Sequence, residues 1–120
     1  MTRTILLVDD SEVIQLTLSA LLEDHGHELA VAGSLAEARA FGDRAFDAAL
    51  VDLNLPDGQG THLLAELRAR WPETVRVLMT GDDKAVAPDA DLVLGKGSDP
   101  GEIGALLDRM IDERRGGRGA

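Results

Sequence analysis

The stretch TILLVDD, residues 4–10, carries an apolar segment directly into two aspartates. A nearly continuous apolar run such as TILLV is typical of a strand that is buried on both faces of a sheet. Carboxylates are costly to bury without a partner. The stretch therefore predicts a central strand whose carboxyl end brings Asp9 and Asp10 to the rim of a sheet.

Similar apolar runs recur along the rest of the chain. They are HELAVA (27–32), DAALV (47–51), TVRVLM (74–79) and DLVLG (91–95). Each is short enough for a strand and is followed by polar residues or glycine. We therefore expect five strands in all.

The segments between these runs have the apolar spacing of amphipathic helices. The core face of the first helix is predicted to comprise Val13, Leu16, Thr17, Ala20 and Leu21, and that of the last helix Ile103, Leu106, Leu107, Met110 and Ile111. Ser34 and Glu37 form a capping box for a short helix. A further helix carries Leu63, Leu64, Leu67 and Trp71, and a cap at Ser98 or Asp99 opens the last one.

Alternation of strands and helices predicts an α/β fold, a doubly wound (βα)5 three-layer sandwich with a parallel five-stranded sheet. Only TGDDKAVAPDA (80–90) separates the last two strands, and Pro88 limits any helix there to about two turns. The fourth helix is thus expected to be shortened or degraded. We predict one domain over residues 1–114 and a flexible tail or truncated linker over 115–120.

Composition excludes several classes of function. Twelve basic against 22 acidic residues give a net charge of −10, which repels nucleic acid and anionic lipid. The absence of cysteine excludes a disulfide framework and a thiolate metal site. No apolar run approaches the ~20 residues of a membrane span. We expect a cytoplasmic protein that contacts neither nucleic acid nor membrane directly.

Polar residues at the strand ends indicate the chemistry, because open α/β sheets bind ligands beyond the carboxyl ends of their strands. Asp9, Asp10, Asp52, Thr80 and Lys96 all stand at such ends. Converging carboxylates repel one another unless a cation is bound, and a few oxygen ligands suit Mg²⁺. The lysine and the threonine hydroxyl suit a phosphoryl group, and a carboxylate is a competent nucleophile. The pattern predicts phosphoryl transfer.

Taken in order, the motifs LLVDDSE, ALVDLNLPDGQG, VLMTGDD and LVLGK resemble the receiver domain of bacterial two-component response regulators, over residues 3 to about 114. The resemblance implies a flavodoxin-like fold with strand order 2-1-3-4-5. It also implies that Asp52 is phosphorylated by a sensor histidine kinase or histidine phosphotransfer protein. A downstream effector protein would then read the phosphorylated state.

The resemblance further implies Mg²⁺ as the cofactor. Asp10 and Asp52 would bind the ion directly, Asp9 through water, and Asn54 through its backbone carbonyl. Thr80 and Lys96 would contact the phosphoryl group. Such a domain is not an enzyme, since it catalyses only its own phosphorylation and autodephosphorylation.

Two positions depart from the receiver pattern. Gly97 follows Lys96 where receivers usually have proline, so we expect a trans peptide bond there. Val93 stands where an aromatic switch residue is usual. These departures keep open a constitutive interaction module with weakened switching. A Mg²⁺-dependent phosphatase is a further alternative, although the chain offers little room for a substrate pocket.

Simpler interpretations of the same residues also remain at this stage. Asp9 and Asp10 are suited to a helix N-cap, and Asp52 to the turn NLPDG. The three histidines, His25, His27 and His62, have no metal-ligand spacing and no triad partners. We expect all three at the surface.

Overall fold

The structure is a computed structural model that describes residues 3–42, 44–82 and 85–119, with side chains described up to residue 114. Its helices are α1 (Glu12–Asp24), α2 (Leu35–Arg39), α3 (Gly60–Arg70) and α4 (Pro100–Gly119). Its strands are β1 (Thr4–Val8), β2 (Glu28–Ala32), β3 (Ala48–Asp52), β4 (Asn54–Leu55), β5 (Gly58–Gln59), β6 (Val75–Thr80) and β7 (Leu92–Gly95).

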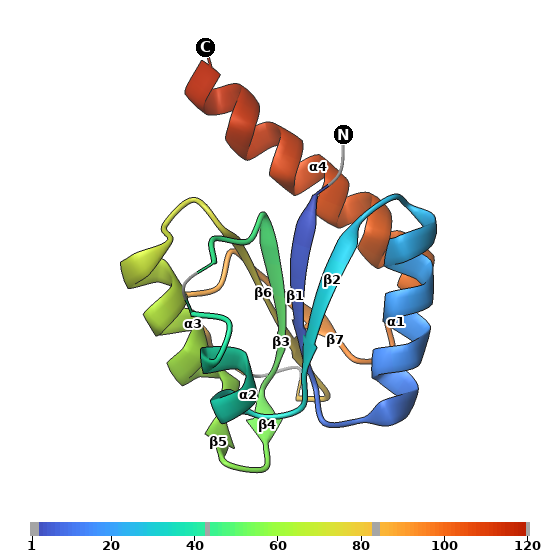
Figure 1. The fold of residues 1–120 in the computed structure, drawn as a ribbon, viewed down its shortest axis with the longest axis vertical. Helices are drawn as coiled ribbons and strands as arrows, with labels where there is room; N and C mark the ends of the chain where they lie inside the picture. The colour runs from blue at the N-terminus through green and yellow to red at the C-terminus, as the bar shows by residue number, and fades with distance from the viewer. Residues whose placement is uncertain (1–2, 43, 83–84, 120) are drawn as a thin grey trace.

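Five strands form one parallel sheet in the order β2-β1-β3-β6-β7, which is the expected order 2-1-3-4-5 (Figure 1). Each neighbouring pair is parallel and in register, as in the pairing of Leu7 with Leu50 across β1 and β3. The carboxyl ends of these strands therefore meet at one edge of the sheet. The predicted fold class is confirmed.

The sheet separates two cores, which explains the continuous apolar runs. Ile5 and Leu7 of β1 pack with α1 and α4, whereas Leu6 and Val8 pack with α2 and α3 on the opposite face (Figure 1). Successive strand side chains point to opposite faces, so a strand covered on both sides needs apolar residues throughout. In α4 the predicted residues Ile103, Leu107 and Ile111 are buried.

The predicted core face of α1 was wrong. Val13 and Leu16 are each 73% exposed, and Thr17 and Ala20 are exposed as well. The helix instead packs through Leu18 and Leu22, with Ile14 partly buried. Apolar residues of α1 form two overlapping stripes, and the spacing alone does not distinguish the stripe that meets the sheet. We call Val13, Leu16, Thr17 and Ala20 the α1 apolar face.

The surface position predicted for His27 was also wrong. His25 and His62 are exposed, but His27 is only 7% exposed, and its Nε2 lies 2.8 Å from Asp108 Oδ1 on α4. Arg3 also donates to the Asp108 side chain and backbone. Packing of α4 across the start of β2 buries this imidazole, a contact between residues 81 positions apart that no local pattern indicates.

The crossover between β6 and β7 contains no helix in its described residues, 81–82 and 85–91. The Arg76 side chain donates instead to the backbone oxygens of Asp89, Pro72 and Thr74. Asp91 accepts from the Arg76 backbone N–H at 2.7 Å and from Arg114 of α4. A buried arginine and its partners thus attach this segment to the sheet in place of a helix.

A short antiparallel hairpin of β4 and β5 follows the third sheet strand and was not predicted. Pro56 and Asp57 form its turn, with proline at a position that fixes the required φ. At the other end of the chain, the backbone of α4 is helical through Gly119. The side chains of residues 115–119 and the whole of residue 120 lie outside the described part, so the tail over 115–120 stays a prediction. Among the residues that the structure describes, no helix is long and apolar enough to cross a membrane.

Candidate functional site

The carboxyl edge of the sheet brings the predicted polar residues together. Asp52 ends β3, and Lys96 directly follows β7. The Lys96 ammonium Nζ lies 2.9 Å from Asp52 Oδ2 and 3.5 Å from Asp9 Oδ2. Asp9, Asp10 and Asp52 each place a carboxylate oxygen within 4.8 Å of the other two. One lysine therefore contacts two of the three clustered acids.

Burial differs sharply among these acids. Asp9 and Asp52 are buried, whereas Asp10 is exposed. Asp9 Oδ1 accepts a hydrogen bond from the Ser11 backbone N–H at 2.9 Å, but Asp9 Oδ2 is buried and has no hydrogen-bond donor. An unsatisfied buried carboxylate oxygen costs free energy. Because three carboxylates converge here and Asp9 Oδ2 has only the ion pair with Lys96 at 3.5 Å, the group could hold a hard cation such as Mg²⁺.

Burial raises the pKa of the Asp9 carboxyl, and the nearby charge of Asp52 adds to the increase against the opposing Ser11 hydrogen bond and Lys96 charge. For Lys96, burial lowers the pKa, but the hydrogen bond to Asp52 and the charges of both acids outweigh it, and the net pKa is raised. The lysine is therefore held in its charged form, and the ionised Asp9 carboxylate is held at a cost.

Replacing Asp9 by asparagine is expected to stabilise the protein in the absence of divalent cations. The folded chain holds the Asp9 proton more tightly than the unfolded chain does, so stability is lost as the pH rises through the raised pKa. At pH 7 the ionised carboxylate is thus a liability that the amide removes, while the amide oxygen keeps the Ser11 hydrogen bond. Thermal unfolding in a chelator should show Asp9→Asn melting a few degrees above the wild type.

The exposed neighbour provides the control for this prediction. Asp10→Asn removes the same charge from a solvated position and should change the melting temperature in chelator by less. With millimolar Mg²⁺ the wild type should instead have the highest melting temperature of the three proteins, because both variants lose a ligand that the wild type keeps. A lower melting temperature for Asp9→Asn in chelator would contradict this account.

Local structure holds the site in place. Ser11 caps α1, and Gln15 of that helix donates its side-chain amide to the Asp9 backbone oxygen. Gly60, the first residue of α3, packs against the end of β3 so closely that a Cβ there would lie 2.0 Å from the Asp52 backbone oxygen. Only glycine permits this approach.

Asp57 is a residue of this region that the sequence analysis missed. It lies in the turn after Asp52, and its carboxylate accepts hydrogen bonds from the backbone N–H groups of Leu35 at 2.8 Å and Ala36 at 3.0 Å. These hydrogen bonds, that from Leu35 foremost, lower the pKa of Asp57. The turn that follows Asp52 is thereby tied to the N-terminus of α2, and the separation of 22 residues from Leu35 hides this contact from any local pattern.

The remaining predicted residues lie around this group. Thr80 is buried at the end of β6, and its hydroxyl oxygen accepts from the Asp82 backbone N–H at 2.9 Å. Asn54 is exposed, and its backbone N–H donates to Asp52 Oδ1 at 3.4 Å. The Lys96–Gly97 peptide bond is trans, as expected. The roles assigned to individual site residues remain predictions.

Comparison with known proteins identifies a family and a curated relative. Residues 5–108 match the family described as the response regulator receiver domain. The photosynthetic apparatus regulatory protein RegA of Cereibacter sphaeroides is 40% identical over 80 residues, which are 66% of this chain and 44% of RegA. The chain therefore spans less than half the length of this curated relative.

Two solved structures extend the likeness to the fold. A CheY-like receiver domain protein of Methanospirillum hungatei superposes with a TM-score of 0.87 at 27% identity, covering 96% of this chain and 98% of that one. A response regulator of Burkholderia pseudomallei, whose structure contains a phosphorylated aspartic acid, a calcium ion and citrate, has a TM-score of 0.80 at 28% identity. That match covers 97% of this chain and 72% of the other.

Proposed function

The chain belongs to the response regulator receiver domain family, and on this premise we propose that Asp52 accepts a phosphoryl group from a sensor histidine kinase or a histidine phosphotransfer protein. The observation that supports the proposal most directly is the contact of Lys96 with Asp52 beside two further carboxylates. A carboxylate at the open edge of the sheet can be reached by a phosphoryl donor, and the adjacent lysine can stabilise the charge of the phosphorylated product.

The three carboxylates fit a magnesium ion, since they are oxygen ligands and Asp9 has a buried oxygen without a donor. We propose that Asp10 and Asp52 hold the ion directly, that Asp9 does so through water, and that the Asn54 carbonyl completes the protein ligands. When bound, the cation neutralises charge on the phosphoryl oxygens.

The chain's own residues have distinct parts in the proposed transfer. An Asp52 carboxylate oxygen attacks the phosphorus, the new O–P bond forms as the P–N bond to the donor imidazole breaks, and the electron pair returns to the imidazole. Lys96, which is already charged and 2.9 Å from Asp52, is positioned to pair with a phosphoryl oxygen. The Thr80 hydroxyl hydrogen is available for the same group, because its oxygen acts as acceptor for Asp82.

As a receiver domain the chain is a signalling module, and its partners are proposed to be proteins. The α1 apolar face borders the site, since Val13 and Thr17 line a groove that Lys96 also lines. An exposed apolar surface of this kind is suited to contact with a protein partner. We propose that an effector protein reads the phosphorylated form. The relatives give no support to the constitutive alternative, and a cytoplasmic location stays a prediction.

Intact-mass spectrometry tests this function. Incubation of the full chain with acetyl phosphate and Mg²⁺ should add one phosphoryl group, and a chelator should prevent the addition because uncompensated carboxylates repel the incoming phosphate. Peptide mapping after borohydride reduction should place the group on the peptide that contains Asp52. Equal modification with and without the chelator would refute the magnesium site, and modification elsewhere would refute the assigned acceptor.

A further inference from the structure

The β4–β5 hairpin carries the backbone carbonyl that the proposed function assigns to magnesium. Asn54 is the first residue of β4, and it pairs with Gln59 across the hairpin. The ladder consists of only two residue pairs. A hairpin of that size is not stable by itself in water. The direction of the Asn54 carbonyl therefore depends on the contacts that the hairpin makes with the rest of the protein.

The inner end of the hairpin is attached to the sheet. Leu53, which precedes β4, donates its backbone N–H to the Met79 carbonyl of β6 at 2.9 Å and accepts from the Gly60 N–H at 2.7 Å. Among residues 54–59, all of which the structure describes, only Leu55 is buried. One buried side chain does not fix the tilt of the outer end, so the hairpin needs a second point of attachment.

Asp57 provides this second attachment, at the turn of the hairpin. Its two carboxylate oxygens accept from two backbone N–H groups of α2, those of Leu35 at 2.8 Å and Ala36 at 3.0 Å. Hydrogen bonds to an ionised acceptor are stronger than neutral ones, and two of them fix direction as well as distance. Gly58 follows with a φ of 151°, and a Cβ there would lie 2.8 Å from Leu35 Cδ1. The turn is thus held closely against the helix.

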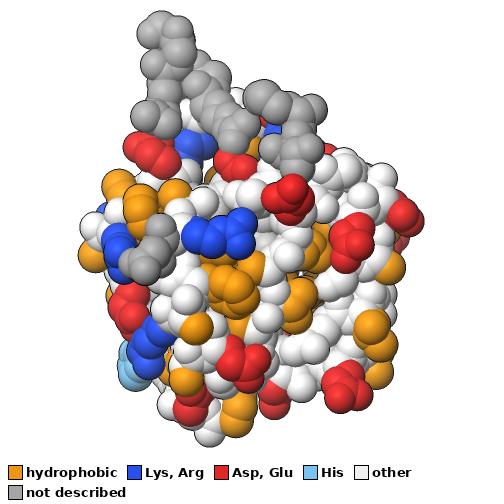
Figure 2. Space-filling view, viewed as in Figure 1, with side chains coloured by type: hydrophobic (Ala, Val, Ile, Leu, Met, Phe, Trp, Pro, Cys, Tyr) orange, Lys and Arg blue, Asp and Glu red, His pale blue; other side chains and the backbone are white. Residues whose placement is uncertain are grey.

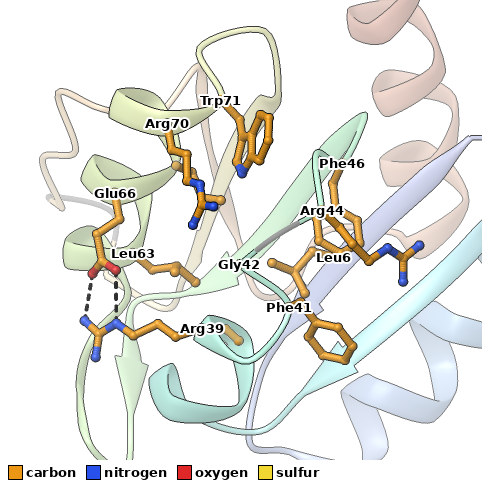
Figure 3. A pocket seen from close by; sticks show the side chains of 12 residues that line it. Leu6, Arg39, Phe41, Gly42, Arg44, Phe46, Leu63, Glu66, Arg70 and Trp71 are labelled. Carbon is orange, nitrogen blue, oxygen red and sulfur yellow. Dashed lines mark hydrogen bonds and ion pairs between the residues drawn. The ribbon is translucent and has the colours of Figure 1, made fainter.

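The helix α2 is a firm support for this attachment, although it has only five residues. Leu35 and Ala38 are buried in the core on this face of the sheet. Arg39 also forms a two-point ion pair with Glu66 of α3, beside a cavity of about 280 Å³ (Figure 3). Both side chains of that pair are about half exposed, so the pair contributes little. Burial of Leu35 and Ala38 is what fixes α2 in place.

The helix has a cap of its own, so Asp57 is not required to begin it. Ser34 is the N-cap of α2, and its hydroxyl accepts from the Glu37 backbone N–H at 3.1 Å. Asp57 is exposed, and Figure 2 shows acidic side chains at the surface in the region of α2 and the hairpin. Water could therefore satisfy the Ala36 N–H at this position. The consequence that only Asp57 provides is the placement of the hairpin.

We propose that Asp57 is a positioning residue for the magnesium site, because it joins the turn of the hairpin to α2 and so holds the Asn54 carbonyl in the direction of the ion. The inference rests on the proposed function, from which it takes this carbonyl as a ligand. Mg²⁺ demands near-ideal octahedral geometry, so rotation of one carbonyl lowers the affinity. Groups that orient a metal ligand typically contribute about tenfold or more to that affinity.

Titration of the ¹⁵N-labelled full chain with MgCl₂ tests the proposal. The backbone amide signals of the site residues give the dissociation constant of the ion. Asp57→Ala removes both acceptors and should raise this constant about tenfold. Asp57→Asn keeps one carbonyl oxygen as an acceptor and should raise it less, by about threefold. The asparagine variant also decides the question if Asp57→Ala does not fold.

Two control variants separate positioning from capping and from charge. Ser34→Ala removes the cap of the same helix and touches no residue of the hairpin. It should lower the melting temperature and leave the dissociation constant within about twofold of the wild type. Glu37→Gln removes one negative charge from the first turn of α2 and keeps an acceptor for the Gly33 N–H. It too should leave the constant within about twofold, because exposed charges are screened by salt.

Phosphorylation by acetyl phosphate provides a second measurement. In Asp57→Ala, the Mg²⁺ concentration that gives half the maximal rate should rise about tenfold. The rate at saturating Mg²⁺ should stay within about twofold of the wild type, because the acceptor and the lysine are unaltered. A third measurement needs no metal. In a chelator, hydrogen exchange of the Gly60 N–H, which bonds to Leu53, should be faster in Asp57→Ala than in Ser34→Ala.

Three results would overturn the inference. They are an unchanged dissociation constant in both Asp57 variants, an equal rise in Ser34→Ala, and a tenfold loss of the maximal rate at saturating Mg²⁺, which would place Asp57 in the reaction itself. A wild type that binds Mg²⁺ without phosphorylation of Asp52 would refute the proposed function, and the dissociation constants would still decide the role of Asp57. A wild type that binds no Mg²⁺ would refute both.

Discussion

The Asp52→Asn variant is expected to lose phosphorylation by acetyl phosphate, with the rate of phosphoryl incorporation falling at least about a hundredfold. The amide that replaces the carboxylate is not a nucleophile, so no O–P bond can form at this position. The amide oxygen still accepts from Lys96, which lies 2.9 Å from the present carboxylate. The variant should therefore fold, and the loss should be chemical. Intact-mass spectrometry over time measures the rate in both proteins.

An exposed aspartate provides the matched control for this substitution. Asp24 is the last residue of α1 and is exposed. Asp24→Asn makes the same change of charge and mass and should be phosphorylated at the wild-type rate. Circular dichroism should show the same secondary structure in all three proteins. If Asp52→Asn still gained one phosphoryl group at a comparable rate, another residue would be the acceptor, and the assignment of this site would fail.

The second large effect is on stability. Asp91→Ala is expected to lower the free energy of unfolding by about 3 kcal/mol, because it removes the carboxylate that pairs with the buried Arg76 side chain together with the hydrogen bonds which that carboxylate accepts. The Arg76 side chain is only 8% exposed, and its guanidinium lies 3.5 Å from Asp91. Burial already lowers the pKa of Arg76, and the charge of Asp91 offsets part of that cost. The substitution also removes acceptors for the Arg76 backbone N–H and for Arg114.

Urea denaturation measures this loss, and a neighbouring acid gives the comparison. Asp89 lies in the same segment, but its carboxylate pairs with Arg68, whose side chain is 57% exposed. Asp89→Ala should cost no more than about 1 kcal/mol, as is usual for pairs in solvent. A loss of about 3 kcal/mol is a large share of the 5–15 kcal/mol that stabilises a typical domain. Equal losses in both variants would show that Arg76 does not hold the crossover through Asp91.

These predictions depend on parts of the protein that the sequence reveals to very different degrees. The acceptor site follows from local patterns, because a parallel sheet brings the carboxyl ends of its strands to one edge. Asp52 and Lys96 could therefore be placed together from the ends of two apolar runs. The Arg76 network could not, because Arg76 stands inside one apolar run and its acid is 15 residues away, at the start of the next run.

For the helix α1 as well, the sequence reveals some features and hides others. The presence of α1 could be predicted from its apolar spacing, but its core face and its cap at Ser11 could not. A stripe through Val13 and Leu16 and another through Leu18 and Leu22 both have helical periodicity. Only contact with the sheet and with α4 selects one of them. The exposed stripe then borders the carboxylate site, since Val13 and Thr17 line a groove that Lys96 also lines.

By itself, the sequence determined the order of the five sheet strands, the doubly wound sheet and the set of polar residues at its carboxyl edge. Each of these depends on periodicity, capping or strand ends, which are local properties of the chain. The tertiary structure alone decided which face of α1 is buried, that His27 is buried beside Asp108, and that Trp71, Phe41 and Phe46 share one cavity. Those outcomes depend on the packing of residues that are far apart in sequence, and their free energies exist only once the sheet has brought the segments together.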